Sequence, residues 1–414
     1  MVDARRVVVL GAGAAGLWAA ARAAELGAQV TVLEKTARAG TKILASGGTR
    51  CNLTTTLGPL EAAALFGERG RRFSRRALQN LTPSDVRARF AALDVPTVEA
   101  PLEKIFPASD RARDVRDALL GWATRSGATF VFEAHVNALE RGNGEWIVRT
   151  TTGDAFRADR VLVAVGGRSY PKSGTTGDAY AWLRSLDLPL VEPVPALVPL
   201  TSPAPWVAEM TGIAWESAVV RAQDADGRRL AERTRPIVFT HHGVSGPGAM
   251  DVSEAVARGL ATELVVDLVP DVEREELRRR LMDLGRTAGA TKLARAVGGI
   301  VEDVLPRKLA RAVLNQAELG DERAGELDKR RRHLLVEALR GFRVPVDGTR
   351  GWAHAEVTAG GLALSAVDPS SMAVRGVEGL FVAGEVLDLQ GPIGGLNFQA
   401  AWATAELAAV ALGR

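Results

Sequence analysis

Three glycines near the amino terminus have the spacing of a loop that binds phosphate groups. They follow the apolar run 7–10 and precede an alanine-rich segment that is typical of a helix. The first glycine of such a loop permits a tight turn, the second lets a phosphate approach the backbone, and the third lets the helix pack on the strand. Free amides at the helix start then attract the pyrophosphate of a dinucleotide. We therefore predict cofactor contacts from Gly11, Gly13, Ala14, Ala15 and Gly16.

A carboxylate at the end of the second expected strand completes this motif. Glu34 follows Gly16 by 18 residues and ends the alternating run 28–34, and Lys35 comes next. A carboxylate at this point accepts hydrogen bonds from the adenosine ribose, so Glu34 and Lys35 join the predicted cofactor site. A signal peptide is the alternative, because two arginines precede an uncharged run, but the glycine spacing and Glu34 speak against it.

The end of the chain repeats the opening pattern. A strand over 379–383 leads through a loop of glycines and acids into a helix over 400–412. Asp388 offers an acceptor for the ribityl hydroxyls of FAD, and the positive end of the helix dipole favours the charge of a reduced flavin. An NAD-only domain has no need of this return, so we expect FAD. Contacts are predicted for Gly384, Glu385, Asp388, Gly394, Gly395, Leu396, Asn397 and Phe398.

The loop 39–52 is dense in glycine and small polar residues and carries two cations, as expected of a segment that wraps a cofactor. It resembles the BaiN/YhiN-like flavoproteins, which include aminoacetone oxidase-like proteins and share a Gly-x-Lys-x-x-x-Ser-Gly-Gly-Gly-Arg-Cys-Asn motif. Thr49 stands where the third glycine is usual. The resemblance implies that the flavin site includes Lys42, Ser46, Gly47, Arg50, Cys51 and Asn52.

Two further stretches match the same family. The buried run 159–167 ends in Gly166 and Gly167, at the strand end where open α/β sheets bind ligands. The resemblance implies that the segment after them lies against the flavin and that the backbone near Val136 meets the adenine. A Phe-Thr-His-x-Gly-x-Ser-Gly-Pro motif contains His241, which we predict to be catalytic because histidine transfers protons near neutral pH. A hydrogen-bonded structural histidine is the alternative.

Composition limits the remaining classes of function. Of 414 residues, 47% are hydrophobic and 24% charged, which is typical of a soluble protein of two or three domains. No uncharged run is long enough to cross a bilayer, so we expect a cytoplasmic protein without membrane contact. The single cysteine, Cys51, excludes a dithiol redox centre, and it either packs or lies beside the flavin. No metal-ligand spacing occurs, so no metal is expected.

The charge distribution gives little support for nucleic-acid binding. The net charge is +3, and the basic clusters 69–76 and 329–332 lack interleaved aromatic residues. We therefore expect a small-molecule substrate and no nucleic acid.

Together these patterns predict an α/β fold with a discontinuous Rossmann-type FAD-binding domain over 1–190 and 351–414. A β-rich substrate domain over 191–270 and 341–350 is inserted, and it carries a helical subdomain over 271–340.

The predicted function is that of an FAD-dependent oxidoreductase. In the favoured form, the flavin accepts a hydride from an amine or hydroxy compound and is reoxidised by oxygen or another acceptor. One alternative is an NAD(P)H-dependent reductase of enone or steroid-like substrates. It would take NAD(P)H as a diffusible donor, because no second glycine fingerprint occurs. Another alternative is a flavin-dependent RNA-modifying enzyme or a redox-responsive binding protein.

Overall fold

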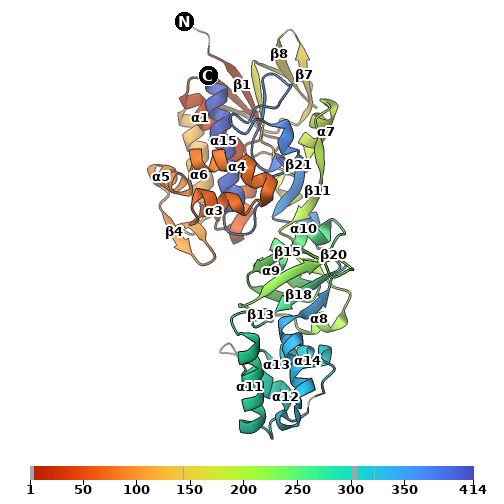
Figure 1. The fold of residues 1–414 in the computed structure, drawn as a ribbon. Helices are drawn as coiled ribbons and strands as arrows, with labels where there is room; N and C mark the ends of the chain where they lie inside the picture. The colour runs from red at the N-terminus through yellow and green to blue at the C-terminus, as the bar shows by residue number, and fades with distance from the viewer. Residues whose placement is uncertain (1–3, 143, 301–304, 321) are drawn as a thin grey trace. The chain divides into compact units, whose positions relative to one another are not determined.

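The chain folds into two compact units, Met1–Pro195 with Glu356–Arg414, and Ala196–Ala355. The computed structural model describes residues 4–142, 144–300, 305–320 and 322–414. Both boundaries lie five residues beyond the predicted 190 and 351. The reason is that strand β11 (Leu190–Ala196) pairs with β21 (Val357–Leu362). Because the two strands are paired, nearly all of β11 and the whole of β21 belong to the first unit. Figure 1 follows the chain through both units.

A five-stranded parallel sheet is the centre of the first unit. Its strands lie in the order β22 (Leu380–Val382), β10 (Arg160–Val163), β1 (Arg6–Leu10), β2 (Gln29–Leu33) and β6 (Thr129–Val131). Buried valines and leucines fill β1 and β10, as expected where both faces of a parallel sheet are covered. All five carboxyl ends therefore lie along one edge of this sheet, where open α/β sheets bind ligands.

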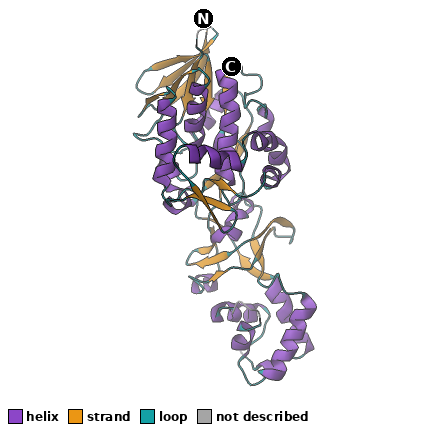
Figure 2. Ribbon diagram, turned by 90° about the vertical axis from the view of Figure 1, so that its left-hand side faces the viewer, coloured by secondary structure: helices purple, strands orange, loops and turns teal. Residues whose placement is uncertain are grey.

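Three helices are joined by tryptophans beside this sheet. The ring of Trp18 on α1 (Ala14–Glu25) lies 5.3 Å from that of Trp122 on α6 (Ala112–Arg125). It lies 5.6 Å from the ring of Trp402 on α15 (Leu396–Gly413). Figure 1 shows these helices side by side, and Figure 2 shows the same unit turned by 90°, with helices in purple and strands in orange. The first and last helices of the chain thus share one buried aromatic contact, which is worth about 0.5–1.5 kcal/mol per ring pair beyond burial alone.

Smaller elements complete the first unit. An antiparallel meander follows β6, and the Thr82 side chain accepts a hydrogen bond from the Asp85 amide and so caps the helix that begins at Pro83. The helices are α2 (Thr41–Ala45), α3 (Pro59–Ala64), α4 (Gly67–Asn80), α5 (Pro83–Ala92) and α7 (Asp178–Ser185). The strands are β3 (Thr54–Thr55), β4 (Thr97–Ala100), β5 (Lys104–Pro107), β7 (Val136–Gly142), β8 (Glu145–Thr150) and β9 (Ala155–Ala158).

The second unit combines two antiparallel sheets with a helical part. One sheet has the order β13 (Ala214–Trp215), β16 (Ile237–Thr240), β17 (Gly243–Ser245), β12 (Leu200–Thr201) and β20 (Gly348–Thr349). The other has the order β15 (Arg229–Thr234), β14 (Val219–Gln223), β18 (Glu263–Asp267) and β19 (Phe342–Pro345). The helices are α8 (Pro205–Glu209), α9 (Gly246–Asp251), α10 (Ser253–Ala257), α11 (Arg274–Thr287), α12 (Leu293–Gly298), α13 (Arg307–Gln316) and α14 (Lys329–Arg340).

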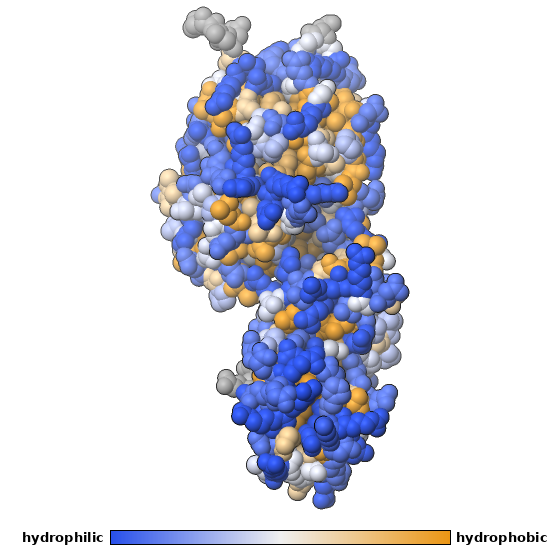
Figure 3. All heavy atoms as spheres, viewed as in Figure 1, coloured by the Kyte–Doolittle hydropathy of each residue, from blue (hydrophilic) through white to orange (hydrophobic). Residues whose placement is uncertain are grey.

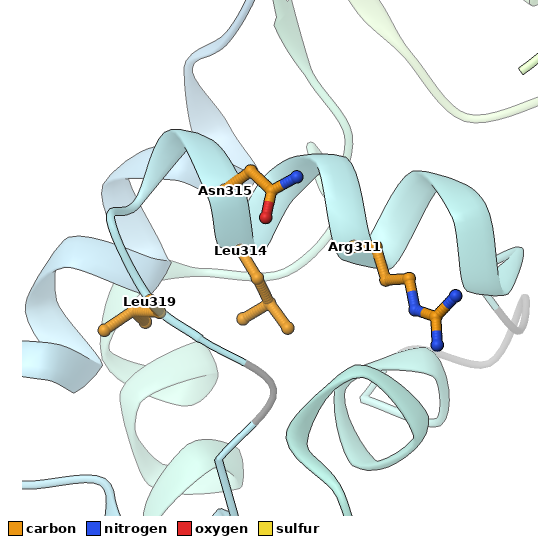
Figure 4. Close-up of a pocket in the computed structure, with 4 residues that line it drawn as sticks. All are labelled: Arg311, Leu314, Asn315 and Leu319. Carbon is orange, nitrogen blue, oxygen red and sulfur yellow. The ribbon is translucent and has the colours of Figure 1, made fainter. Parts of the chain in front are cut away.

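The helical part shares its core with the sheets. Leu335 and Leu339 on α14 are fully buried in the same apolar cluster as Phe342 and Leu264. A hollow of about 290 Å³ lies beside α13 and is lined by Arg311, Leu314, Asn315 and Leu319 (Figure 4). Its lining holds no acid and no histidine, so it offers no acid–base chemistry.

The face in Figure 3 is mostly hydrophilic on both units. Within the described ranges, no helix has the length and apolar character needed to cross a membrane.

Candidate cofactor site

The three glycines after β1 have different surroundings. A Cβ on Gly11, whose φ is +92°, would lie 2.8 Å from the Ala164 carbonyl oxygen, and one on Gly16 would lie 1.8 Å from the Gly11 carbonyl oxygen. A Cβ on Gly13 would meet no atom within 4 Å. Gly11 and Gly16 are therefore required by packing, whereas Gly13 borders open space. This is the arrangement that a phosphate group needs to reach the backbone.

The start of α1 offers unused amides to that space. Within the described residues, no side chain caps the helix at Gly13, and its first turn holds no acid. The amides of Ala14, Ala15 and Gly16 have no carbonyl four residues back inside the helix, so they point outward with the positive end of the dipole. An anion is the natural partner for such a start.

Glu34 is held beside this loop at the end of β2. Its Oε2 accepts a hydrogen bond from the Ala12 amide at 2.8 Å, and its Oε1 accepts from the Thr36 amide at 2.8 Å. The Ala134 amide donates to the Glu34 carbonyl oxygen at 3.0 Å, which brings Val136 at the start of β7 to the same edge. The Thr36 hydroxyl also donates to Oε1, at 2.7 Å. A carboxylate has acceptor sites for about four hydrogen bonds, so Glu34 retains capacity for one bond from a ribose hydroxyl.

Lys35 is turned to another loop. Its Nζ donates to Thr176 Oγ1 at 2.6 Å and forms an ion pair with Asp178 at the start of α7. Lys35 therefore ties the end of β2 to the loop that follows β10. Its predicted contact with the cofactor remains a prediction.

The start of α15 repeats the features of the α1 start. Gly395 has a φ of +83°, and a Cβ there would lie 1.9 Å from the Thr54 carbonyl oxygen, so only glycine fits. Within the described residues, no side chain caps this helix, which leaves the amides of Leu396, Asn397 and Phe398 open. The side chain of Asn397 is engaged nearby, because its Oδ1 accepts from the Gly391 amide and its Nδ2 donates to the Gly391 carbonyl oxygen, both at 2.8 Å.

Both helix starts lie at the same end of the first unit. Arg22 Nε on α1 donates to Glu406 Oε1 on α15 at 2.9 Å, and Trp18 faces Trp402 further toward the two starts. From Trp18 to Arg22 on α1, the contacting residue on α15 moves forward by the same number of positions, from Trp402 to Glu406. The two helices therefore run parallel. A Cβ on Gly384, in the loop after β22, would lie 2.9 Å from Ala15 Cβ. The two ends of the chain thus present their open amides along one edge.

The loop 39–52 turns sharply beside the α15 start. Gly47, Gly48 and Thr49 have successive φ values of +54°, +66° and +71°, and Cys51 follows at +63°. Thr49 adopts a left-handed conformation that disfavours a β-branched residue, which explains why glycine is usual there. Asn52 Oδ1 accepts from the Ile105 amide at 3.0 Å.

The polar side chains of this loop are engaged with protein groups. Ser46 Oγ donates to the Ile43 carbonyl oxygen at 2.7 Å. Arg50 Nε pairs with Asp110 at 2.5 Å, and its guanidinium lies 4.1 Å from the centre of the Phe106 ring. Direct binding of the cofactor by these side chains stays a prediction, while the backbone of Gly48 borders open space.

A charged network joins three loops at the sheet edge. Lys42 forms an ion pair with Glu385 and donates to Ser169 Oγ at 2.5 Å, while Ser169 Oγ donates to Glu385 Oε1 at 2.5 Å. The Thr358 amide also donates to Glu385 Oε1, at 2.9 Å. A Cβ on Gly167 would lie 2.3 Å from Thr358 Oγ1, so this glycine is required by close approach of the two segments.

Sequence reasoning missed Ser169 and Thr358 as site residues. Ser169 lies in the segment after Gly166 and Gly167, so its place in the chain was the available signal. Thr358 offered none, because its role depends on packing against Gly167 and on the amide that it donates to Glu385.

Tyr180 on α7 was also missed. Its side chain is 95% buried, and its hydroxyl has no hydrogen-bond partner among the described residues. Burial raises the pKa of this phenol, and the charges of Glu385 and Asp388 raise it further, so the hydroxyl keeps its proton. Asp388 itself accepts from the Gly360 amide at 3.1 Å. A buried hydroxyl without a partner is a group whose bonding a ligand can complete.

His241 lies in the second unit, in the turn between β16 and β17. Its side chain is exposed, and its ring centre lies 4.0 Å from that of His242. Its predicted catalytic role is not decided by these contacts. Within the described ranges, no group of three His, Cys, Asp or Glu side chains is arranged to hold a metal ion.

The glycine contacts predict opposite effects for two substitutions. Gly13→Ala should leave the unfolding free energy of the cofactor-free protein within about 1 kcal/mol, because its Cβ meets no atom, but should weaken FAD binding by filling the phosphate space. Gly16→Ala should destabilise the cofactor-free protein itself. Urea unfolding without FAD and fluorescence titration with FAD measure the two effects, and equal FAD affinity in Gly13→Ala would contradict this assignment.

Burial predicts an inert thiol at Cys51. The side chain is fully buried, and burial raises its pKa to about 12, so the thiolate is negligible at neutral pH. Iodoacetamide should therefore leave the native protein unlabelled from pH 7 to about pH 9 and should label it fully in denaturant. Rapid labelling of the folded protein, followed by mass spectrometry, would show instead that Cys51 is reactive.

Comparisons with known proteins agree with this architecture. The family described as HI0933-like protein Rossmann domain matches residues 5–411. The 3-dehydro-bile acid delta(4,6)-reductase of Clostridium scindens is 32% identical over 97% of this chain and 98% of its own length. The ribosomal RNA dihydrouridine synthase of Haemophilus influenzae is 30% identical over 98% of each chain.

A solved structure supports the fold alone. The 3-ketosteroid delta1-dehydrogenase from Sterolibacterium denitrificans, in complex with 1,4-androstadiene-3,17-dione, covers both chains fully with a TM-score of 0.53 at 13% identity.

The cofactor fits the residues that line this edge. Two uncapped helix starts, the open space at Gly13 and the unpartnered Tyr180 hydroxyl are complementary to the diphosphate, the ring and the hydroxyls of FAD. The family and the Rossmann-type fold expected from the sequence are confirmed. This chain belongs to the HI0933-like Rossmann family, and it is an FAD-dependent oxidoreductase.

Proposed function

We propose that this protein is a reductase that adds hydrogen across a carbon–carbon double bond conjugated with a carbonyl group. Support comes from two relatives, each at least 30% identical over nearly the whole chain. One is named a delta(4,6)-reductase of a 3-dehydro-bile acid, and the other makes dihydrouridine, the saturated form of uridine. Both names describe the saturation of a double bond that a carbonyl group activates.

The arrangement of the site suits this chemistry. Bound FAD in its reduced form supplies the hydride. The open amides of Leu396, Asn397 and Phe398 favour negative charge that builds up at the α15 start. Lys42 and Ser169, joined through Glu385, hold protons within hydrogen-bond reach of one another. Tyr180 keeps its proton and can donate to a ligand oxygen.

Two parts of this proposal concern groups outside that network. His241 is the proposed proton donor to the second carbon, on the strength of its motif. NADH or NADPH is the proposed diffusible source of electrons.

In the oxidation of an amine or hydroxy compound, which the sequence favoured, hydride passes from the substrate to the flavin instead of from the flavin to the substrate. Neither of the two curated relatives described above carries a name of that kind. The reductive direction is therefore the better supported one, and the oxidative direction is the outcome that would replace it.

Uridine within RNA is the second candidate substrate. Helix α4 buries Phe73 and Leu78 against the first unit and exposes five arginines on its other face. Only one of the five forms an ion pair within the described residues, with Glu68. Unpaired guanidinium groups on one helix face attract phosphate groups. The exposed side chains are Arg69, Arg71, Arg72, Arg75 and Arg76.

The test is reoxidation of reduced protein under argon. Protein reduced with NADPH is mixed with a 4,6-dien-3-one steroid, a simple cyclic enone, or an unmodified uridine-containing RNA. We expect the oxidised flavin spectrum to return and the product to gain two hydrogens by mass. The matched control is the saturated ketone of the same skeleton, which should leave the flavin reduced.

The same experiment separates the candidates. Reoxidation by RNA alone, with binding that weakens steeply as salt is raised, would select uridine as the substrate. Failure of every double-bond substrate, combined with anaerobic bleaching of oxidised protein by an amine or hydroxy compound, would overturn the proposed reductase.

A further inference from the structure

Three of the five histidines of this chain gather in one place in the second unit. His241 and His242 form the two-residue turn between β16 and β17, and His354 ends the short 3-10 helix Trp352–His354. Arg350 follows β20. Strand β12 lies between β17 and β20 in one sheet. The segments that hold the four residues follow or connect strands of this sheet. Side chains from separate segments have therefore been brought together by folding.

The cluster is held by specific contacts. The ring centres of His241 and His242 lie 4.0 Å apart, and Arg350 Nη2 lies 3.1 Å from His354 Nε2. The Ser202 amide donates to the His242 carbonyl oxygen at 3.0 Å, and the Arg350 amide donates to the Pro199 carbonyl oxygen at 2.8 Å. The backbone at His242 and at Arg350 is thus hydrogen-bonded to the residues that flank β12, Ser202 and Pro199.

The turn itself cannot relax away from this position. Gly243, directly after the two histidines, has a φ of +153°, and a Cβ there would lie 2.3 Å from the Leu200 carbonyl oxygen. Thr240 Oγ1 donates to the Gly243 carbonyl oxygen at 3.2 Å, and the His242 amide donates to Thr240 Oγ1 at 3.3 Å. The backbone of the turn is therefore fixed at the positions from which the His241 and His242 side chains project.

The charges of the cluster are of one sign. Among the residues that the structure describes, Arg350 and the three histidines form no ion pair with a carboxylate, and Arg350 instead contacts His354. Partial removal from water lowers the pKa of His242, and the positive charge of Arg350 and the neighbouring His241 and His354 lower it further. Like charges held together cost folding energy, and an anion bound among them would offset that cost.

Two other uses fit less well. Within the described residues, no group of three metal-binding side chains has the arrangement needed for a metal ion. A purely structural role is also a poor fit, because all three histidine side chains are exposed to solvent rather than packed.

We propose that His241, His242, His354 and Arg350 form a binding site for an oxyanion, a phosphate or carboxylate group carried by a ligand of this protein. A guanidinium group supplies fixed positive charge and paired donors, and imidazole rings add N–H donors that gain charge when an anion approaches. His241 is also the proton donor proposed above, but the anion site is tested separately, because anion binding can be measured without turnover.

The experiment is a titration of the full chain followed through the histidine ring protons by NMR. Inorganic phosphate is the first probe and acetate the second, at constant ionic strength. His135 and His333 lie outside the cluster and serve as internal references. We expect saturable shifts of the His241, His242 and His354 signals, with the references unmoved. Binding should tighten as the pH falls through the lowered pKa of His242, because an anion favours the charged ring.

Matched variants separate the site from general charge effects. Arg350→Gln should weaken phosphate binding by about tenfold, as expected for loss of one charge-assisted contact. Arg330→Gln removes the same charge from an exposed position on α14 and should have no effect. His354→Gln, compared with His333→Gln, repeats the comparison without touching Arg350 and guards against misfolding of the first variant.

The two titrations and the variants distinguish the kinds of ligand and can overturn the proposed anion site. Shifts with phosphate alone identify a phosphate-bearing ligand, and shifts with both probes include carboxylates. Absence of saturation with either probe, equal shifts of all five histidines, or unchanged binding in both Arg350→Gln and His354→Gln would overturn the proposal. Absence of anion binding by the unmodified protein, together with flavin reoxidation by an enone, would overturn this proposal and leave the proposed reductase intact, so the two proposals fail separately.

Discussion

The parallel packing of α1 against α15 is the constraint on which the cofactor site depends. Trp18 donates its indole N–H to Glu406, and Arg22 donates to the same carboxylate, so one acid on the last helix holds two side chains of the first. Charge-assisted hydrogen bonds of this kind contribute about 1.5–3 kcal/mol each when removed from bulk water. Because the helices run parallel, this contact aligns their starts, and the positive ends of both dipoles lie along the same edge of the first unit.

The loops between these helices are then forced together. Gly384 must approach Ala15, Gly395 must approach Thr54, and Gly167 must approach Thr358. These close approaches also place polar side chains from separate segments next to one another, among them Lys42, Ser169 and Glu385, which form the charged network. The network is thus a consequence of helix packing at the edge of a parallel sheet, and it need not be encoded by any one motif.

This explains what the sequence could predict. The glycine spacing after β1 predicts a phosphate loop, because turn geometry and close approach are local properties that glycine alone provides. The pairing of Lys42 with Glu385 could not be predicted, because these residues lie 343 positions apart and their contact depends on the whole sheet. The same applies to Tyr180, whose significance comes from burial and from a missing partner, neither of which a sequence displays. The unit boundary at Pro195 lies five residues beyond the expected 190 because β11 pairs with β21 across the chain crossing, and this pairing has no signal in the local sequence.

The most direct test of the account is amide hydrogen exchange of the protein with and without FAD. The account predicts that FAD slows exchange both at residues 13–16 and at residues 396–398, since both helix starts bind one cofactor, while α11 in the second unit is unchanged. Protection of the first helix start without the second would contradict it. That result would mean that the diphosphate is bound at α1 and that the last helix serves only to cover the sheet.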